Sequence, residues 1–113
     1  MHELSLVLSM IEICEEQARL KGFERIEKIV IEAGMLSGVS VPSLRFSFDS
    51  ARKGTITEWA VLEVMEPPGT GWCVSCSRTV LLNDPFRECP GCGHGGITPT
   101  GGMDFRIREL RVR

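Results

Sequence analysis

Apolar residues recur every three or four positions through the first part of the chain, and this spacing predicts an amphipathic helix. Most charged side chains of the segment lie off the predicted stripe. Lys21 in the last turn and Gly22 just beyond it are typical of a helix C-terminus. The predicted stripe contains Leu4, Val7, Leu8, Ile11, Cys14 and Ala18.

The next segments predict a strand, a second helix and a second strand. Apolar and polar side chains alternate over residues 25–33, as in a strand with Ile29, Ile31 and Ala33 on one face. After the run GMLSG, Ser40 is expected to cap a helix that has Pro42 in its first turn and that Gly54 closes. Its predicted buried stripe is Val41, Leu44, Phe48 and Ala51. The second strand is predicted at about residues 59–66, with Ala60, Leu62 and Val64 on one face.

The sequence changes character after residue 66. The run Pro67-Pro68-Gly69 is typical of a boundary. Residues 71–99 are rich in Cys, Gly and Pro, and we expect too few large apolar side chains there for a core of its own. Residues 103–113 again have the composition of a strand. Their apolar alternation is interrupted between Ile107 and Leu110, which would fall on opposite faces of a regular strand, so a bulge or twist is predicted.

These segments predict an α/β (α+β) protein. Residues 1–66 and 103–113 would form one domain, in which two helices pack on a three-stranded sheet. Residues 67–102 would form an inserted, zinc-ribbon-like domain.

Composition narrows the functional classes. The chain has 113 residues, 42% of them hydrophobic and 25% charged, as in an ordinary folded domain. A net charge of −2 does not suggest a general nucleic-acid or membrane binder. The start of the chain lacks the basic region of a signal peptide, so a cytoplasmic location is expected. In that reducing compartment, paired cysteines hold metal more often than they form disulfides.

Four cysteines form two C-x-x-C pairs, Cys73/Cys76 and Cys89/Cys92. Two such pairs can make a closed tetrahedral site of four thiolates, which suits zinc or iron. Two disulfides or a rubredoxin-like iron site are the alternatives to zinc. A closed site has no open position for a substrate, so the metal is expected to fold the insertion and not to catalyse a reaction.

Three further features have both a structural and a functional interpretation. His94 lies two residues after Cys92 and is either a polar loop residue or an auxiliary zinc ligand. Cys14 is expected to be a buried core thiol and not a nucleophile. The C-terminal arginines form either a solvated strand face or a docking surface for an anionic partner; they are Arg106, Arg108, Arg111 and Arg113.

The chain begins Met1-His2-Glu3. A terminal amine, main-chain amides, an imidazole and the Glu3 carboxylate within three residues form a compact N,O-rich set. Such a set favours square-planar or tetragonal Ni(II) or Cu(II). Considered alone, a histidine near an N-terminus is more often inert.

Three stretches together resemble the HypA/HybF family of hydrogenase nickel-insertion accessory proteins: MHELSL, EAGMLSGVSVPSLRFSFDSARKGT and CVSC…CPGCG. The resemblance covers essentially the whole chain. It implies a nickel metallochaperone, not an enzyme, that works with the GTPase HypB and delivers nickel to the large-subunit precursor of [NiFe]-hydrogenase, and in some organisms also serves urease. Monomers and dimers both occur in the family.

The resemblance also implies which residues bind each metal. Nickel would bind at His2 with Met1 and Glu3 as neighbours, and zinc at Cys73, Cys76, Cys89 and Cys92. His94 matches a histidine that flanks the zinc ligands in some members. The chain departs from the family after its LSGV segment, where many members have an acidic residue and this chain reads SVPS at residues 40–43, and at residues 102–105, where it reads GMDF. Neither departure affects a proposed ligand.

A second functional class stays open. A zinc-ribbon module that binds protein or nucleic acid would need the four cysteines but would have no use for His2. Nickel binding that depends on His2 distinguishes the two classes.

Overall fold

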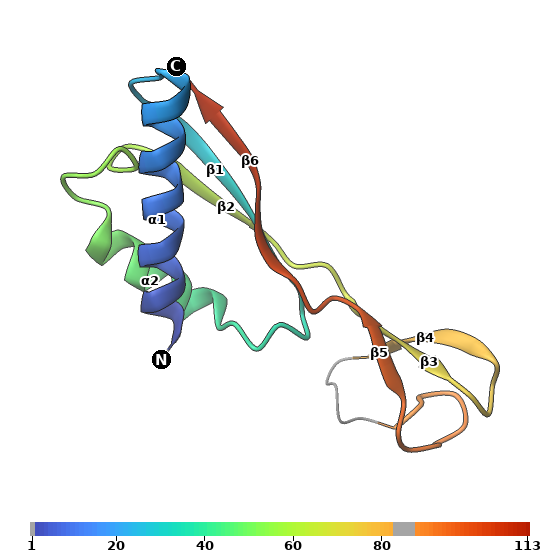
Figure 1. Ribbon diagram of the computed structural model, residues 1–113. Helices are drawn as coiled ribbons and strands as arrows, with labels where there is room; N and C mark the ends of the chain where they lie inside the picture. The colour runs from blue at the N-terminus through green and yellow to red at the C-terminus, as the bar shows by residue number, and fades with distance from the viewer. Residues whose placement is uncertain (1, 83–87) are drawn as a thin grey trace. The chain divides into compact units, whose positions relative to one another are not determined.

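The computed structural model describes residues 2–82 and 88–113. It contains two helices and six strands (Figure 1): α1 (His2–Lys21), β1 (Ile26–Ala33), α2 (Val41–Ala51), β2 (Val61–Met65), β3 (Gly69–Cys73), β4 (Arg78–Leu82), β5 (Thr98–Gly101) and β6 (Phe105–Val112). One sheet has the strand order β2-β1-β6 and the other the order β4-β3-β5. The predicted mixed fold, with two helices and a sheet plus a cysteine-bearing insertion, is confirmed. No helix in the described ranges is long and apolar enough to cross a membrane.

Two compact units divide the chain. The helical unit contains Met1–Ile31, Ser40–Val64 and Ile107–Arg113, and the cysteine unit contains Glu32–Val39 and Met65–Arg106. Each unit has buried side chains of its own, so each is described separately below.

Helix α1 buries only part of the apolar stripe that its pattern predicts. Val7, Ile11 and Cys14 are buried as predicted, and so is Met10, which lies outside that stripe, whereas Leu4 and Leu8 are 48% and 53% exposed. The prediction was wrong for these two leucines because the helix is rotated so that a 3-7-10-14 spacing faces inward, which also brings Glu3 into the buried set. The helix ends as expected: Gly22 has a φ of 77°, and its N–H donates to the Ala18 carbonyl at 2.8 Å.

Helix α2 begins where the sequence predicts it. Ser40 is the N-cap, and its hydroxyl accepts a hydrogen bond from Ser43 N at 3.4 Å. Leu44 and Phe48 are buried as expected, while Val41 and Ala51 are only half-buried. The helix ends at Ala51, three residues before Gly54, because turns occupy the segment that follows.

The sheet of the helical unit has β1 at its centre. Residues 29–33 of β1 are all buried, so the predicted alternation with exposed positions does not hold there. Strand β1 is flanked by β2 and β6, so its side chains have neighbouring side chains beside them on both faces of the sheet. On β6, Phe105, Ile107 and Leu110 are half-buried, which confirms the predicted change of phase after Ile107. Strand β2 begins at Val61, two residues later than predicted, and Trp59 lies exposed in the preceding turn.

In the cysteine unit, β3 pairs with β4 and β5 in antiparallel fashion. The prediction that the insertion lacks a core needs correction. Val80, Leu82 and Ile97 are buried together with Cys73 and Cys89, and Leu36 packs against them. The core is small, and it draws Leu36 from outside the insertion. Leu36 is held there because its N–H donates to the Gly102 carbonyl at 2.7 Å.

Glycine is required where the segment carrying Leu36 passes the end of β5. A Cβ atom on Gly34 would collide with the main chain of Gly102. Gly102 itself has a φ of 78°, a conformation that other residues rarely adopt. The neighbouring hydrogen bond from Gly34 N to the Asp104 carbonyl is 2.9 Å long.

Candidate metal centres

Two tight turns present the four paired cysteines. Cys73 ends β3 and Cys76 lies in the turn before β4, where Ser77 has a φ of 53°. Cys89 and Cys92 lie in the turn that precedes β5, and Gly93 there has a φ of 75°. Main-chain N–H groups point at the sulfurs: Cys76 N is 3.4 Å from Cys73 Sγ, and Gly91 N is 3.3 Å from Cys89 Sγ.

The structure brings all four sulfurs together. Cys73 Sγ lies 3.6 Å from Cys92 Sγ, and Cys76 Sγ lies 3.8 Å from Cys89 Sγ. All four Sγ atoms lie within 4.8 Å of one another, and none forms a disulfide. Zinc–sulfur bonds of about 2.3 Å in a tetrahedron place sulfurs roughly 3.8 Å apart. The cluster therefore fits a zinc ion held by four thiolates.

Ionisation of the cluster is uneven. Burial opposes ionisation of Cys89, but the N–H groups of Cys92 and Gly91, with neighbouring thiols, lower its pKa to about 6. The N–H of His94 acts to lower the pKa of Cys92, but the neighbouring thiols and burial raise it to about 12. The tendency to lose a proton therefore differs between the sulfurs of the cluster. A metal ion must displace the remaining protons, so metal binding is linked to pH.

His94 is bound into the second turn through its main chain. Its carbonyl accepts a hydrogen bond from Cys89 N at 2.9 Å, and its N–H bonds to Cys92. The residue is exposed. The four-sulfur cluster is formed by the cysteines, so the auxiliary ligand role of His94 stays a prediction.

The N-terminal candidate site lies in the helical unit. Met1 lies outside the described residues. His2 is the first residue of α1, and its imidazole is 58% exposed with Nε2 4.0 Å from the Glu3 carboxylate. Glu3 is almost buried, and its Oε2 accepts a hydrogen bond from Ser40 N at 3.0 Å. This bond lowers the pKa of Glu3 against the opposing effect of burial.

Sequence reasoning missed the contact between Glu3 and Ser40. The two residues are 37 positions apart, and a glutamate in the first turn of a helix is expected at the surface. The predicted capping role of Ser40 could have indicated this contact. The main-chain N–H of an N-cap residue lies outside the helix and needs an acceptor from elsewhere. Here Glu3 supplies the acceptor for that N–H.

Cys14 lies apart from both candidate sites in the core of α1. It is fully buried, and burial, with a contribution from Glu15, raises its pKa to about 11. The burial confirms the prediction of a core thiol. The raised pKa disfavours the thiolate, which is the form that attacks substrates and binds metals.

Comparisons with known proteins agree with these features. Residues 1–112 match the family described as "Hydrogenase/urease nickel incorporation, metallochaperone, hypA". Proteins named hydrogenase maturation factor HypA are 43% identical in Beijerinckia indica and 36% identical in Dechloromonas aromatica, each over 99% of this chain and 99% of the relative.

A solved structure has the same fold. The solution structure of the Ni metallochaperone HypA from Helicobacter pylori matches with a TM-score of 0.69 and 26% identity, over 99% of this chain and 97% of that one. The match to the family and the identity to its members both extend over nearly the full length, so this chain belongs to the HypA family of nickel-incorporation metallochaperones.

Proposed function

We propose that this chain is a nickel carrier that binds Ni(II) at Met1-His2-Glu3 and delivers it to the large-subunit precursor of [NiFe]-hydrogenase, with urease as a further target. The observation that carries the proposal is the exposed imidazole of His2 at the start of α1, beside the carboxylate of Glu3. A carrier must release its cargo, and a few ligands on an exposed segment allow release better than a closed cage.

The residues suit this division of labour between two metals. Imidazole, amine and amide nitrogens with a carboxylate favour Ni(II), whereas four thiolates favour zinc. In this proposal the domain formed by residues 1–66 and 103–113 carries nickel. The insertion of residues 67–102 carries zinc.

Zinc would be held by Cys73, Cys76, Cys89 and Cys92, with His94 as an auxiliary ligand. When bound, it would cross-link the two turns and would supply no open coordination position. The role of zinc is therefore structural, and we assign no enzymatic activity to the chain.

The family supports the remaining assignments. Hydrogenase maturation implies partners in the maturation machinery, and we propose a HypB-type GTPase, the hydrogenase precursor and urease accessory proteins. The proposed location is the cytoplasm, and the proposed oligomeric state is a monomer or homodimer.

A nickel titration tests the proposal. Untagged protein that begins with Met1 is compared by calorimetry with His2→Ala and with a chain carrying a short N-terminal extension. We expect about one zinc and one nickel per wild-type chain, and we expect both altered chains to keep zinc and lose tight nickel binding. His94→Ala is the matched control and should bind nickel like the wild type.

Equal nickel binding by the wild type and His2→Ala would contradict the proposal. The chain would then be better described as a zinc-ribbon module that binds protein or nucleic acid without metal transfer. If the extended chain bound nickel tightly while His2→Ala did not, only the role of the terminal amine would be refuted.

A further inference from the structure

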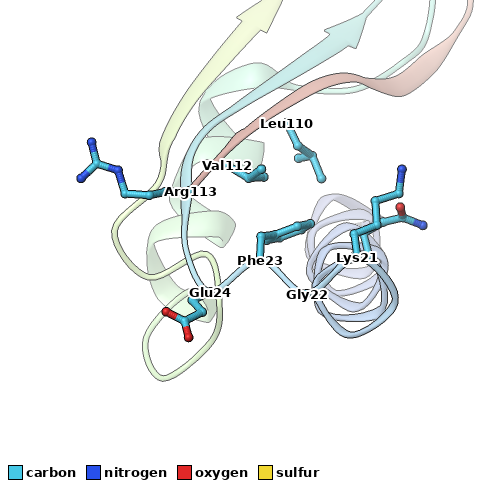
Figure 2. Close-up of a pocket in the computed structure, with 8 residues that line it drawn as sticks. Lys21, Gly22, Phe23, Glu24, Leu110, Val112 and Arg113 are labelled. Carbon is cyan, nitrogen blue, oxygen red and sulfur yellow. The ribbon is translucent and has the colours of Figure 1, made fainter.

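An open groove lies in the helical unit between the end of α1 and the end of β6. It has a volume of about 720 Å³ and is lined by Gln17, Lys21, Gly22, Phe23, Glu24, Leu110, Val112 and Arg113. Figure 2 shows Phe23 between the end of α1 and the side chains of Leu110 and Val112, whereas Glu24 and Arg113 point away. The floor of the groove is therefore apolar.

The groove borders the edge of a sheet, because β6 is the outer strand in the order β2-β1-β6. Arg113 N donates to the Arg25 carbonyl at 2.9 Å, and Glu24 N donates to the Arg113 carbonyl at 3.1 Å. Both main-chain groups of Arg113 thus face β1. Successive residues of a strand direct these groups to opposite sides, so those of Val112 face the open edge.

At the opposite edge of the same sheet, two arginines, one in α2 and one at its C-cap, cover one carbonyl of β2 and two in the segment just before it. Arg45 Nη1 donates to the Leu62 carbonyl at 3.0 Å, and Arg52 donates to the carbonyls of Glu58 and Ala60. Unpaired strand edges invite pairing with another chain, and folded proteins commonly cover them. The β2 edge is therefore partly covered by arginine side chains, whereas the β6 edge borders an open groove.

The two faces of β6 differ in chemistry near this edge. Leu110 and Val112 face the groove, while Arg111 and Arg113 occupy the alternate positions. The Arg113 side chain is 76% exposed and contacts Glu27 through Nε, and the exposed Arg111 side chain contacts Glu109 through one Nη. A guanidinium offers five donors, so each arginine keeps further donors for a carboxylate of a partner. An added strand would place alternate side chains over the apolar floor and the others beside these arginines.

A second copy of this chain is a poor occupant. Residues 107–113 read IRELRVR, with three arginines and one glutamate. Pairing β6 with itself would bring together two segments that each carry a net charge of +2 from three arginines and one glutamate, and such like-charged segments repel each other. The positive charge favours an acidic strand.

We propose that the β6 edge and its groove bind an extended peptide segment of another protein, in which apolar and acidic residues alternate. Its main chain pairs with β6 at Val112, its apolar side chains cover Phe23, Leu110 and Val112, and its carboxylates meet Arg111 and Arg113. This docking surface does not depend on nickel binding.

The test uses the full zinc-loaded chain and a fluorescein-labelled octapeptide of alternating glutamate and valine, followed by fluorescence polarisation. We expect saturable binding that weakens with salt. We expect Val112→Lys to weaken binding roughly tenfold or more, a loss of about 1.4 kcal/mol. Val61→Lys, on the covered β2 edge, is the matched control and should bind as the wild type does.

Two further measurements keep the test independent of folding defects. Lys21→Glu alters only an exposed side chain at the rim of the groove, so it should leave the fold unchanged and weaken binding of the acidic peptide. An octapeptide N-methylated at alternate residues loses strand pairing and should not bind.

Several outcomes would overturn the proposal. They are absence of binding to the wild type, equal weakening by Val61→Lys and Val112→Lys, or undiminished binding of the N-methylated peptide. A dimer in sedimentation experiments that Val112→Lys dissociates would assign the edge to a second copy instead.

Discussion

The carboxylate of Glu3 accepts a hydrogen bond from the main-chain N–H of Ser40 at 3.0 Å. Ser40 is also the N-cap of α2 through its hydroxyl, so one residue links the first turn of α1 to the first turn of α2. His2 immediately precedes Glu3, and its imidazole is exposed. The proposed nickel ligand is therefore carried on a turn that is fixed to the helical unit.

Removing the hydroxyl of Ser40 should destabilise the helical unit. Ser40→Ala leaves Ser43 N without its cap, and loss of such a cap costs roughly 0.5–2 kcal/mol. Chemical denaturation followed by circular dichroism measures the difference. Ser50→Ala, in the last turn of the same helix, should change stability much less. Equal effects of the two substitutions would show that the cap contributes nothing specific.

The contact between Glu3 and Ser40 should also make stability depend on pH. The hydrogen bond from Ser40 N lowers the pKa of Glu3 below its ordinary value of 4.5 in the folded protein. The charged form therefore stabilises the fold above that value, and the contribution is lost as pH falls through the lower folded pKa. We expect the melting temperatures of the wild type and Glu3→Gln to differ at pH 7 and to converge below about pH 4. A difference that stays constant down to pH 3 would contradict this.

Local signals account for the parts that the sequence predicted well. Ser40 with Pro42 fixes the start of α2, Gly22 fixes the end of α1, and the spacing of the four cysteines brings their sulfurs together. Each of these signals involves residues that are close together in the sequence. The local structure that they favour therefore does not depend on how the rest of the chain packs. The four-thiolate cluster involves two turns and the antiparallel pairing of β3 with β4 and with β5.

The predictions that failed depend on tertiary contacts. Periodicity identifies α1 as amphipathic but does not fix its rotation, because Leu4, Leu8 and Met10 are all apolar and only tertiary packing decides which of them is covered. Likewise, Leu36 completes the small core of the cysteine unit from a segment outside the insertion. Nothing in the local pattern around Leu36 indicates that packing partner.

The two kinds of cysteine should respond differently to substitution. Cys76→Ser removes one ligand of the four-sulfur cluster, so we expect the bound zinc to fall from about one per chain to near zero. Cys14→Ala should keep its zinc, because Cys14 lies in the core of α1 and outside the cluster. Elemental analysis of purified protein measures the zinc. Retention of tightly bound zinc by Cys76→Ser would contradict the four-thiolate site.

Zinc removal should unfold the cysteine unit while the helical unit stays folded. Among the described residues, the core of the cysteine unit contains five buried side chains, and two of them are the cysteines Cys73 and Cys89. Without metal, the described apolar core consists of Val80, Leu82 and Ile97 with the partly buried Leu36, and so small a core rarely supports a fold. The helical unit instead buries residues such as Val7, Met10, Ile29, Leu44 and Phe48. After chelation, amides of β3, β4 and β5 should lose protection from hydrogen exchange, amides of α1 and α2 should keep it, and added zinc should restore the difference. Uniform loss of protection would show that the two units fold as one, and unchanged protection in β3–β5 would show that zinc is not needed there.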